Sequence, residues 1–187
     1  MAAFFAPERL ETDAFTLRCY LPGDGAALAD ATTSSYDHLR PWMGWASADQ
    51  TVTQSEELVR RFRADYLVNA DFVLGIWAPD GSALWGGTGF HRHGGVERGV
   101  AEIGMWIRAD RAGRGLGTAA LRAVLGWGFD AWPWERLAWH CDERNTASRR
   151  TAEAAGMRHE GALRGDVPEV GEGRRTTLVY GLTRADV

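Results

Sequence analysis

The spacing of apolar residues changes along the chain, and each change predicts a different element of secondary structure. Over residues 15–21 apolar side chains occupy every second position, which is typical of a half-buried strand. Over residues 51–70 Leu58, Phe62 and Tyr66 recur at intervals of four on one face, which predicts a long helix. The chain therefore begins with a strand and continues into helical structure.

Capping and turn residues indicate where further elements begin and end. Asp24 is a candidate N-cap for the first helix, and Thr53 and Glu56 have capping-box spacing at the start of the long one. Gly94-Gly95 predicts a turn, and Gly156 predicts the end of a short helix. The remaining predicted elements are a helix within residues 22–39, strands over 71–78, 83–93 and 100–109, a helix over 117–131, a strand over 135–143, a helix over 145–156, and strands over 157–165 and 174–183.

This order of elements predicts one α/β domain over residues 1–187, with a mixed sheet and no linker or repeat. The pattern gives about seven strands and about four helices. Two strands, over 100–109 and 135–143, are joined by the helix over 117–131, which predicts a right-handed parallel crossover.

Composition and charge narrow the class of protein. The 187 residues carry a net charge of −4, so the molecule as a whole has no positive field to attract nucleic acid. The chain has no stretch of about 18 apolar residues that would span a membrane and no signal-peptide pattern at its start. Cys19 and Cys141 are far apart and form no metal-binding or redox motif, so we expect a cytoplasmic protein without a metal.

A glycine-rich loop precedes the helix predicted over 117–131. Gly113, Gly115 and Gly117 alternate with other residues beside Arg111 and Arg114. The N-terminus of a helix offers unpaired N–H groups and partial positive charge, and glycines let a ligand approach the backbone closely. A phosphate-bearing ligand is therefore expected, with a glycine-rich surface loop that binds no ligand as the alternative. The chain has no lysine for a Walker A loop, and the glycine spacing does not match a dinucleotide-binding fingerprint.

Two segments resemble one enzyme superfamily. Residues 101–129 resemble the acetyl-coenzyme A binding segment of GNAT N-acetyltransferases, in which a strand leads into a Q/R-x-x-G-x-G/A loop and a helix. Residues 135–164 resemble the next segment of the RimJ/RimL-like branch, and residues 38–46 resemble its tryptophan-containing loop. The motifs that carry the second resemblance are Asn145-x-x-Ser148, Gly156-Met157 and Glu160-Gly161-x-x-Arg164.

The resemblance implies a mostly antiparallel sheet that is splayed between the strands over 100–108 and 136–142. It implies acetyl-CoA as a co-substrate, with the pyrophosphate on the amides of the glycine loop and pantetheine along the first of these strands. Ala112 stands where the family usually has Gln or Arg, but the backbone amides do not depend on that side chain. The expected cofactor-binding residues are Met105, Trp106, Ile107, Ala112, Gly113, Arg114, Gly115, Leu116, Gly117, Thr118, Asn145 and Ser148.

Two residues are candidates for the chemistry of acetyl transfer. Alternation places Glu102, Gly104 and Trp106 on one strand face, where the missing side chain of Gly104 leaves room for an amine. Glu102 is therefore the candidate general base, with a solvent-facing or salt-bridged glutamate as the alternative. Ser148 corresponds to the serine that the branch places near the coenzyme sulfur, and helix capping with Asn145 is its alternative role.

Other residues are weaker candidates for the site. His140 lies on the splayed strand, where a core or cleft-wall role is the simpler interpretation. Trp42 and Trp45 lie outside any periodic element, so they are expected either to line an acceptor site or to anchor their loop. Acidic residues in the loop before the last strand could attract a cationic acceptor, and these are Asp166, Glu169 and Glu172.

The resemblance predicts transfer of acetyl from acetyl-CoA to a primary amine, by direct attack in a ternary complex. The acceptor could be a protein N-terminus or a small-molecule amine. Two alternatives remain: a sensor of the same fold that binds acyl-CoA without turnover, and a ribosome-associated adaptor, which the net acidity argues against. No nucleic-acid or membrane partner is expected, and a homodimer is possible.

Overall fold

We describe the fold from a computed structural model, in which residues 4–92, 96–168 and 173–187 are placed. Over these residues the chain forms one sheet of eight strands in the order β1-β2-β3-β4-β5-β6-β8-β7. The strands are β1 (Arg9–Glu11), β2 (Thr16–Cys19), β3 (Phe72–Trp77), β4 (Leu84–Arg92), β5 (Val100–Ile107), β6 (Arg136–Asp142), β7 (Arg158–Pro168) and β8 (Arg174–Thr183). The α-helices are α1 (Gly25–Thr33), α2 (Tyr36–Leu39), α3 (Val52–Leu67), α4 (Leu116–Ala131) and α5 (Thr146–Ala154).

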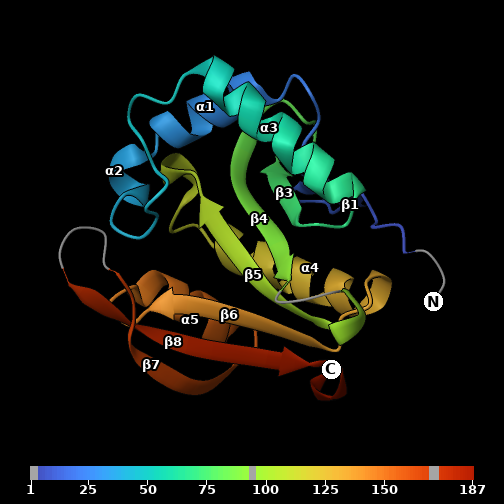
Figure 1. Ribbon diagram of the computed structural model, residues 1–187, viewed down its shortest axis with the longest axis vertical. Helices are drawn as coiled ribbons and strands as arrows, with labels where there is room; N and C mark the ends of the chain where they lie inside the picture. Colours follow the sequence, from blue (N-terminus) through green and yellow to red (C-terminus); the bar gives the residue numbers. More distant parts are fainter. Residues whose placement is uncertain (1–3, 93–95, 169–172) are drawn as a thin grey trace.

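The sheet is divided between β5 and β6. Neighbouring strands elsewhere are antiparallel, whereas β5 and β6 are parallel and pair only through Val100, Ala101 and Glu102. Beyond this point β4 still pairs with β5 as far as Ile107, and β8 pairs with β6 as far as Asp142. The two strands therefore diverge along their lengths, as Figure 1 shows. The predicted parallel crossover and the implied splay are both confirmed.

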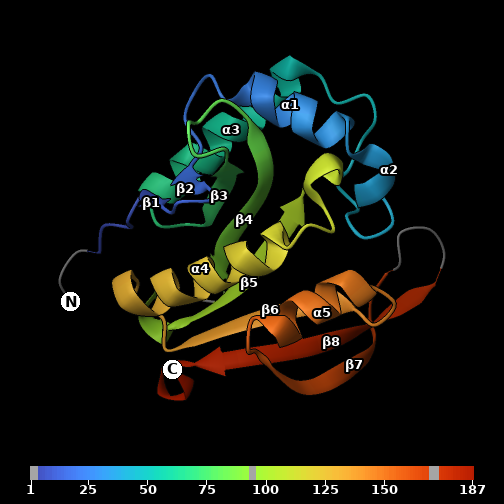
Figure 2. The ribbon, with the colours of Figure 1, turned by 180° about the vertical axis from the view of Figure 1, so that it is seen from behind.

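Helices cover both faces of the sheet. Figure 1 shows α3 in front of β3 and β4, and Figure 2, from behind, shows α4 and α5 on the opposite side. The alternation along β5 follows this arrangement, because Ala101 and Ile103 are buried in the core beneath α4, while Trp106 packs on the side of α1 and α3. A sheet covered on both faces buries apolar side chains on each of them.

Aromatic residues fill the core on the α4 side. The rings of Trp132 and Trp134 are stacked, with centroids 6.1 Å apart and planes 13° from parallel. Phe72 and Phe90 pack their rings against both tryptophans. Arg184 closes this region, because its guanidinium donates hydrogen bonds to the carbonyl oxygens that end α4 and the turn after it. Five of the nine tryptophans are buried and stabilise the fold, and these are Trp77, Trp127, Trp132, Trp134 and Trp139.

The N-terminal third differs from the prediction in three details. The strand β1 is short and has no clear alternation, so the sequence pattern missed it. The single helix predicted within residues 22–39 is two, because α1 ends at Thr33 and α2 begins at Tyr36. Asp24 stands at the N-cap of α1, but its carboxylate makes no capping bond and instead binds Arg18 and the backbone N–H of Leu21.

The capping box of α3 is shifted by two residues from its predicted position. Thr51 accepts a hydrogen bond from the N–H of Gln54, and the Gln54 side chain accepts one from the N–H of Thr51. Glu56 has another role, because its carboxylate accepts hydrogen bonds from the N–H groups of Gly23 and Gly25. The prediction was wrong because the sequence offers two overlapping pairs with capping-box spacing, Thr51 with Gln54 and Thr53 with Glu56. The second pair does not form, because Glu56 is engaged by the backbone at the start of α1.

Near the C-terminus one acidic residue is placed differently from the prediction. Asp166 lies within β7 rather than in a loop, because β7 continues to Pro168 past an irregularity in its pairing with β8. Glu169, Glu172 and the predicted turn at residues 94–95 lie outside the described residues. Gly156 follows α5 with a φ of +92°, a left-handed conformation that favours glycine, so the predicted helix end is confirmed.

Candidate active site

A cavity of about 600 Å³ opens where β5 and β6 diverge, and we call it the seam cavity. Its walls come from the second half of β5, the end of β6, the glycine loop and the start of α5. The described residues that line it include these predicted site residues: Trp42, Glu102, Met105, Trp106, Ile107, Ala112, Gly113, Gly115, Gly117, Thr118, Asn145 and Ser148. Arg114 is exposed, and neither it nor Leu116 lines the cavity.

The glycine loop forms the N-terminal end of α4 as a backbone surface. Gly113 and Gly115 have φ values of +72° and +84°, which L-residues adopt only with strain. A Cβ atom added to either glycine would meet no atom within 4 Å, so the space beside the loop is open. The N-cap, Gly115, has no side chain, and no side-chain hydrogen bond caps the helix. The first amides of α4 are therefore available to an anion.

Of the arginines near the glycine loop, some line the seam cavity and others do not. Arg111 lies over the indole of Trp85, with its guanidinium carbon 4.5 Å from the ring centroid, so it is occupied away from the loop. Arg150 and Arg175 line the seam cavity and add positive charge to it. The sequence analysis missed both because they come from α5 and β8, far from the glycine loop in the chain. The spatial order of the strands, with β8 beside β6, brings Arg175 to this cavity.

The start of α5 places Asn145 and Ser148 in one hydrogen-bonded arrangement. The Asn145 carboxamide oxygen accepts from the N–H of Ser148 at 3.0 Å and so caps the helix. The Ser148 hydroxyl accepts from the indole N–H of Trp139 at 3.0 Å. Burial raises the pKa of the nearby Cys141 thiol, and a hydrogen bond with Ser148 opposes this shift. The hydrogen bond from Trp139 and the helix cap by Asn145 together fix the position of the Ser148 hydroxyl in the seam cavity.

Glu102 and His140 face each other across the seam. The Nδ1 atom of His140 lies 2.9 Å from a carboxylate oxygen of Glu102, and both residues line the seam cavity. The hydrogen bond to Glu102 raises the pKa of His140 above its ordinary value, against the opposing effect of burial. The sequence singled out Glu102 but treated His140 as a cleft-wall residue. Their pairing became visible only from the parallel register of β5 and β6.

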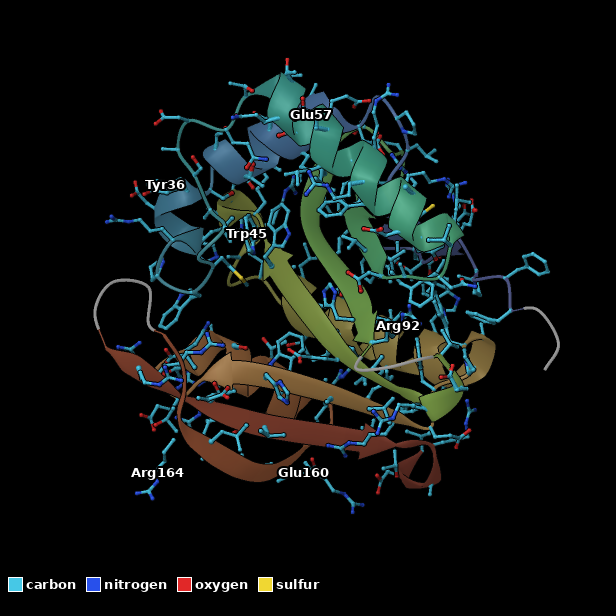
Figure 3. The ribbon with its side chains drawn as sticks, in the orientation of Figure 1. Tyr36, Trp45, Glu57, Arg92, Glu160 and Arg164 are labelled. Carbon is cyan, nitrogen blue, oxygen red and sulfur yellow. The ribbon has the colours of Figure 1, made fainter. Side chains whose placement is uncertain are left out.

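A second cavity, of about 440 Å³, lies between the sheet and helices α1 and α3, and we call it the helix-side cavity. It shares four lining residues with the seam cavity: Met43, Gly104, Met105 and Trp106. The two cavities therefore meet on β5. Trp45 lines the helix-side cavity and Trp42 the seam cavity, so the tryptophan loop contributes to both. Figure 3 shows Trp45 beside β5, while Glu160 and Arg164 lie at the far end of the sheet, on β7.

Glycines on β4 and β5 make room for large side chains at this meeting point. A Cβ atom at Gly87 would lie 2.3 Å from the indole nitrogen of Trp106, and one at Gly104 would lie 2.8 Å from Nε2 of His91. The rings of Trp106 and His91 therefore occupy space that a side chain at either glycine position would need. Trp106 also packs edge-on against Trp45, with ring centroids 6.0 Å apart.

A second imidazole–carboxylate pair lies on the helix-side cavity. The Nδ1 atom of His91 is 2.9 Å from a carboxylate oxygen of Asp71, and both residues line this cavity. Burial disfavours the charged imidazole, but the hydrogen bond and the charge of Asp71 outweigh it, so the pKa of His91 is raised. The sequence analysis missed both residues, because nothing in the local pattern distinguishes them from ordinary strand-end residues.

Other kinds of site have no counterpart in the described part of the chain. Within it, no group of three or more His, Cys, Asp or Glu side chains is placed to hold a metal ion. None of its helices is long and apolar enough to cross a membrane. Cys19 and Cys141 are buried free thiols.

Comparison with known proteins identifies the family. Residues 15–158 match the acetyltransferase (GNAT) domain. A Bacillus subtilis protein named "Putative ribosomal N-acetyltransferase YdaF" is 30% identical over 150 residues, which is 80% of each chain. The structure of Mycobacterium smegmatis RimJ in complex with a CoA disulfide has a TM-score of 0.82 and 27% identity, over 96% of this chain and 87% of that one.

The same fold occurs in a RimL structure, a ribosomal L7/L12 α-N-protein acetyltransferase in complex with coenzyme A. Its TM-score is 0.86 at 15% identity, over 96% of this chain and all of that one (100%). The splayed sheet, the glycine loop before α4 and the match over residues 15–158 agree with one another. The chain belongs to the GNAT acetyltransferase family.

Proposed function

We propose that this acetyltransferase moves the acetyl group of acetyl-CoA to a primary amine, by direct attack while both substrates are bound. The observation that carries the proposal is the meeting of two cavities on β5 at Gly104, Met105 and Trp106. One cavity has an anion-binding backbone loop, and the other opens to the opposite side of the same strand. A donor in one and an acceptor in the other would face each other across this stretch.

The seam cavity suits coenzyme A in shape and chemistry. The free amides from residue 113 to residue 118 would hold the pyrophosphate, and Arg150 and Arg175 would add charge-assisted contacts. Beyond Glu102, β5 has no pairing with β6, so alternate peptide groups face the gap and can pair with pantetheine amides as an added strand would. Acetyl-CoA supplies an activated acetyl thioester to this gap.

Glu102 is the proposed proton acceptor. An amine must lose a proton to attack a carbonyl carbon, and a lysine-type amine with a pKa of about 10.4 is largely protonated at neutral pH. The carboxylate of Glu102 lies at the start of the gap, and His140 holds it at 2.9 Å. The carboxylate can take the proton directly or through a water molecule.

The remaining groups would act on the thioester. A backbone N–H of β5 near Trp106 would donate a hydrogen bond to the carbonyl oxygen as it gains negative charge. The Ser148 hydroxyl accepts from Trp139, so its own O–H can donate a hydrogen bond to the departing thiolate. A thiol with a pKa of about 8.5 is a good leaving group, and its departure needs little help from an acid.

The acceptor is proposed as an amine, either a protein N-terminus or a small molecule. YdaF is named as a putative ribosomal N-acetyltransferase and RimL as a ribosomal L7/L12 α-N-protein acetyltransferase, which supports an N-terminal amine. We treat residues 1–187 as one catalytic domain, because the single sheet takes strands from both ends of the chain. A homodimer stays a prediction.

The experiment that tests this function follows the release of free coenzyme A thiol from acetyl-CoA against a panel of amines and N-terminal peptides. Turnover that depends on an amine supports the proposal, with acetylated product identified by mass spectrometry. The alternative is a sensor that binds acyl-CoA without turnover. It predicts heat of binding in calorimetry with acetyl-CoA and no amine-dependent release of thiol.

A further inference from the structure

We propose that the helix-side cavity binds a small primary amine with a hydrophobic body, and that Asp71 and His91 hold its nitrogen. This inference rests on the proposed function and names the class of acceptor. It depends on the composition of one cavity, on one hydrogen-bonded pair and on the position of both beside Gly104.

The walls of the helix-side cavity are apolar and come from elements far apart in the chain. Helices α1 and α3 supply Leu28, Leu58 and Phe62, and aromatic rings close the other sides. Besides Phe62, the phenol and indole rings of Tyr20, Trp45 and Trp106 line the cavity. At about 440 Å³ the cavity is within the range of small-molecule pockets, about 300–1,000 Å³. It can therefore enclose a compact hydrocarbon or aromatic group.

Three polar side chains on these walls are already engaged within the protein. The Thr32 hydroxyl donates to the carbonyl oxygen of Leu28 at 2.8 Å, and the Thr88 hydroxyl donates to that of Gly104 at 2.9 Å. Gln50 donates from its side-chain nitrogen to Ser55 at 3.1 Å. These bonds leave an apolar surface facing the cavity, and a ligand with many polar atoms would lose hydrogen bonds to water without replacement.

Asp71 and His91 provide the charged end of the cavity. An ionised carboxylate only accepts hydrogen bonds, so the proton in the contact between them belongs to Nδ1 of His91. At a pH above its raised pKa the imidazole is neutral, and it then presents an unshared electron pair at Nε2, the atom that lies against Gly104. An amine nitrogen at this point donates a hydrogen bond to Nε2, and the Asp71 charge complements its positive form.

The position of this pair relates the acceptor to the donor. His91 is the cross-strand partner of Glu102, and Gly104 is two residues further along β5, where the two cavities meet. A nitrogen held at Nε2 of His91 is thus close to Gly104, Met105 and Trp106, where the proposed function places the thioester. It is also close to Glu102, the proposed proton acceptor. A peptide N-terminus would also bring a polar amide into the apolar part, where the described walls offer it few partners.

Steady-state kinetics with matched amines tests the proposal. The apolar probes are 3-methylbutylamine and 2-phenylethylamine, and the polar ones are ethanolamine and short peptides that begin with Ser or Ala. We expect kcat/KM for 2-phenylethylamine to exceed that for ethanolamine by at least about 30-fold, because burial of each methylene-sized group contributes about fourfold and the phenyl ring is larger than two such groups. A preference for ethanolamine or for the peptides would overturn the proposal.

Two variants test the residues themselves. Asp71→Asn is expected to raise the KM for 2-phenylethylamine by about tenfold while the Kd for acetyl-CoA stays unchanged, because a charged hydrogen-bond partner is lost. Val73→Phe places a larger side chain in the cavity, and it is expected to lower kcat/KM for 2-phenylethylamine more than for ethanolamine. The controls are Asp80→Asn and Val68→Phe, at exposed positions outside both cavities.

Binding without turnover separates the two proposals. Titration of 2-phenylethylamine into the protein saturated with coenzyme A should give saturable heat that Val73→Phe weakens and Val68→Phe does not. If peptides or polar amines are acetylated and 2-phenylethylamine neither binds nor reacts, the proposed function stands and this inference fails. If no amine of any class is acetylated, the proposed function fails and the inference fails with it.

Discussion

The seam cavity and the helix-side cavity share one stretch of β5 but are built from different parts of the chain. Backbone groups form much of the seam cavity, through the glycine loop, the N-terminus of α4 and the unpaired part of β5. Side chains form the helix-side cavity, from two helices, a loop and three strands. Backbone recognition tolerates many substitutions, whereas a cavity of side chains changes with each one. In the proposed function, the seam cavity is therefore suited to one cofactor, and the side chains of the helix-side cavity select the acceptor.

The largest effect is expected at Gly104, which lines both cavities. In Gly104→Leu the new Cβ would lie 2.8 Å from Nε2 of His91, and the rest of the side chain would occupy the meeting point. We expect kcat/KM for both substrates to fall at least about 100-fold, since small displacements of reacting groups cost this much. The control is Gly126→Leu, where a Cβ meets nothing within 4 Å. If kcat/KM of Gly104→Leu stays within a few-fold of the control, the reaction does not take place where the two cavities meet.

Glu102→Gln should affect chemistry with little change in binding. Loss of the proton acceptor is expected to lower kcat about 100-fold or more, with the Kd for acetyl-CoA nearly unchanged. Steady-state kinetics and calorimetry measure the two quantities. Glu57→Gln, on an exposed position of α3, is the matched control. A variant that keeps full kcat would assign the proton to another group.

Gly115→Val separates the donor side from the acceptor side. Gly115 has a φ of +84°, so a β-branched residue strains the loop. The strain would turn the first N–H groups of α4 away from the place where they could bind one phosphate. We expect the Kd for acetyl-CoA to rise about tenfold, from a strain of roughly 1–2 kcal/mol, while the KM for the amine stays the same. Ala119→Val, on an exposed position of the same helix, serves as the control. An equal rise in the KM for the amine would contradict the division between the cavities.

The smallest effect concerns the pH dependence of stability. The pKa values of His91 and His140 are both raised from 6.5, by Asp71 and by Glu102 respectively. A raised folded-state pKa means that each pair contributes fully below pH 6.5 and that the contribution is lost as pH rises through the folded-state value. Both imidazoles are partly exposed, so each contribution is below about 1 kcal/mol.

Urea unfolding at a series of pH values measures this contribution. Beyond their partners, His91 is also near the charge of Glu102, and His140 is near Asp166 and Arg136. His91→Gln and His140→Gln should each flatten the fall in unfolding free energy between about pH 6 and pH 8. A wild-type stability that rises over this interval would contradict the assigned direction.

The two cavities also differ in how far the sequence predicts them. The glycine loop, Asn145, Ser148 and Glu102 were predicted because their spacing lies within single strand–loop–helix segments. The order of the elements likewise gave the parallel crossover between β5 and β6. These features depend on residues that are close in sequence, where local pattern and geometry are tightly related.

The helix-side cavity could not be predicted in the same way. Asp71 follows a helix and His91 ends a strand, and only the antiparallel pairing of β3 with β4 brings them together. Arg175 reaches the seam cavity because β8, not β7, lies beside β6. Long-range strand order decides such contacts, and a single sequence contains little information about it. The shifted capping box at Thr51 shows the same limit on a local scale.

The short pairing of β5 with β6 has a consequence for the order in which substrates arrive. Only three residues of β5 connect the two parts of the sheet directly, so a coenzyme in the gap would replace the missing strand contacts and complete the wall behind Gly104. An amine that enters first would meet an incomplete wall and no acyl group. Under the proposed function, this architecture therefore predicts a compulsory sequence in which coenzyme enters before the amine and leaves after the amide product.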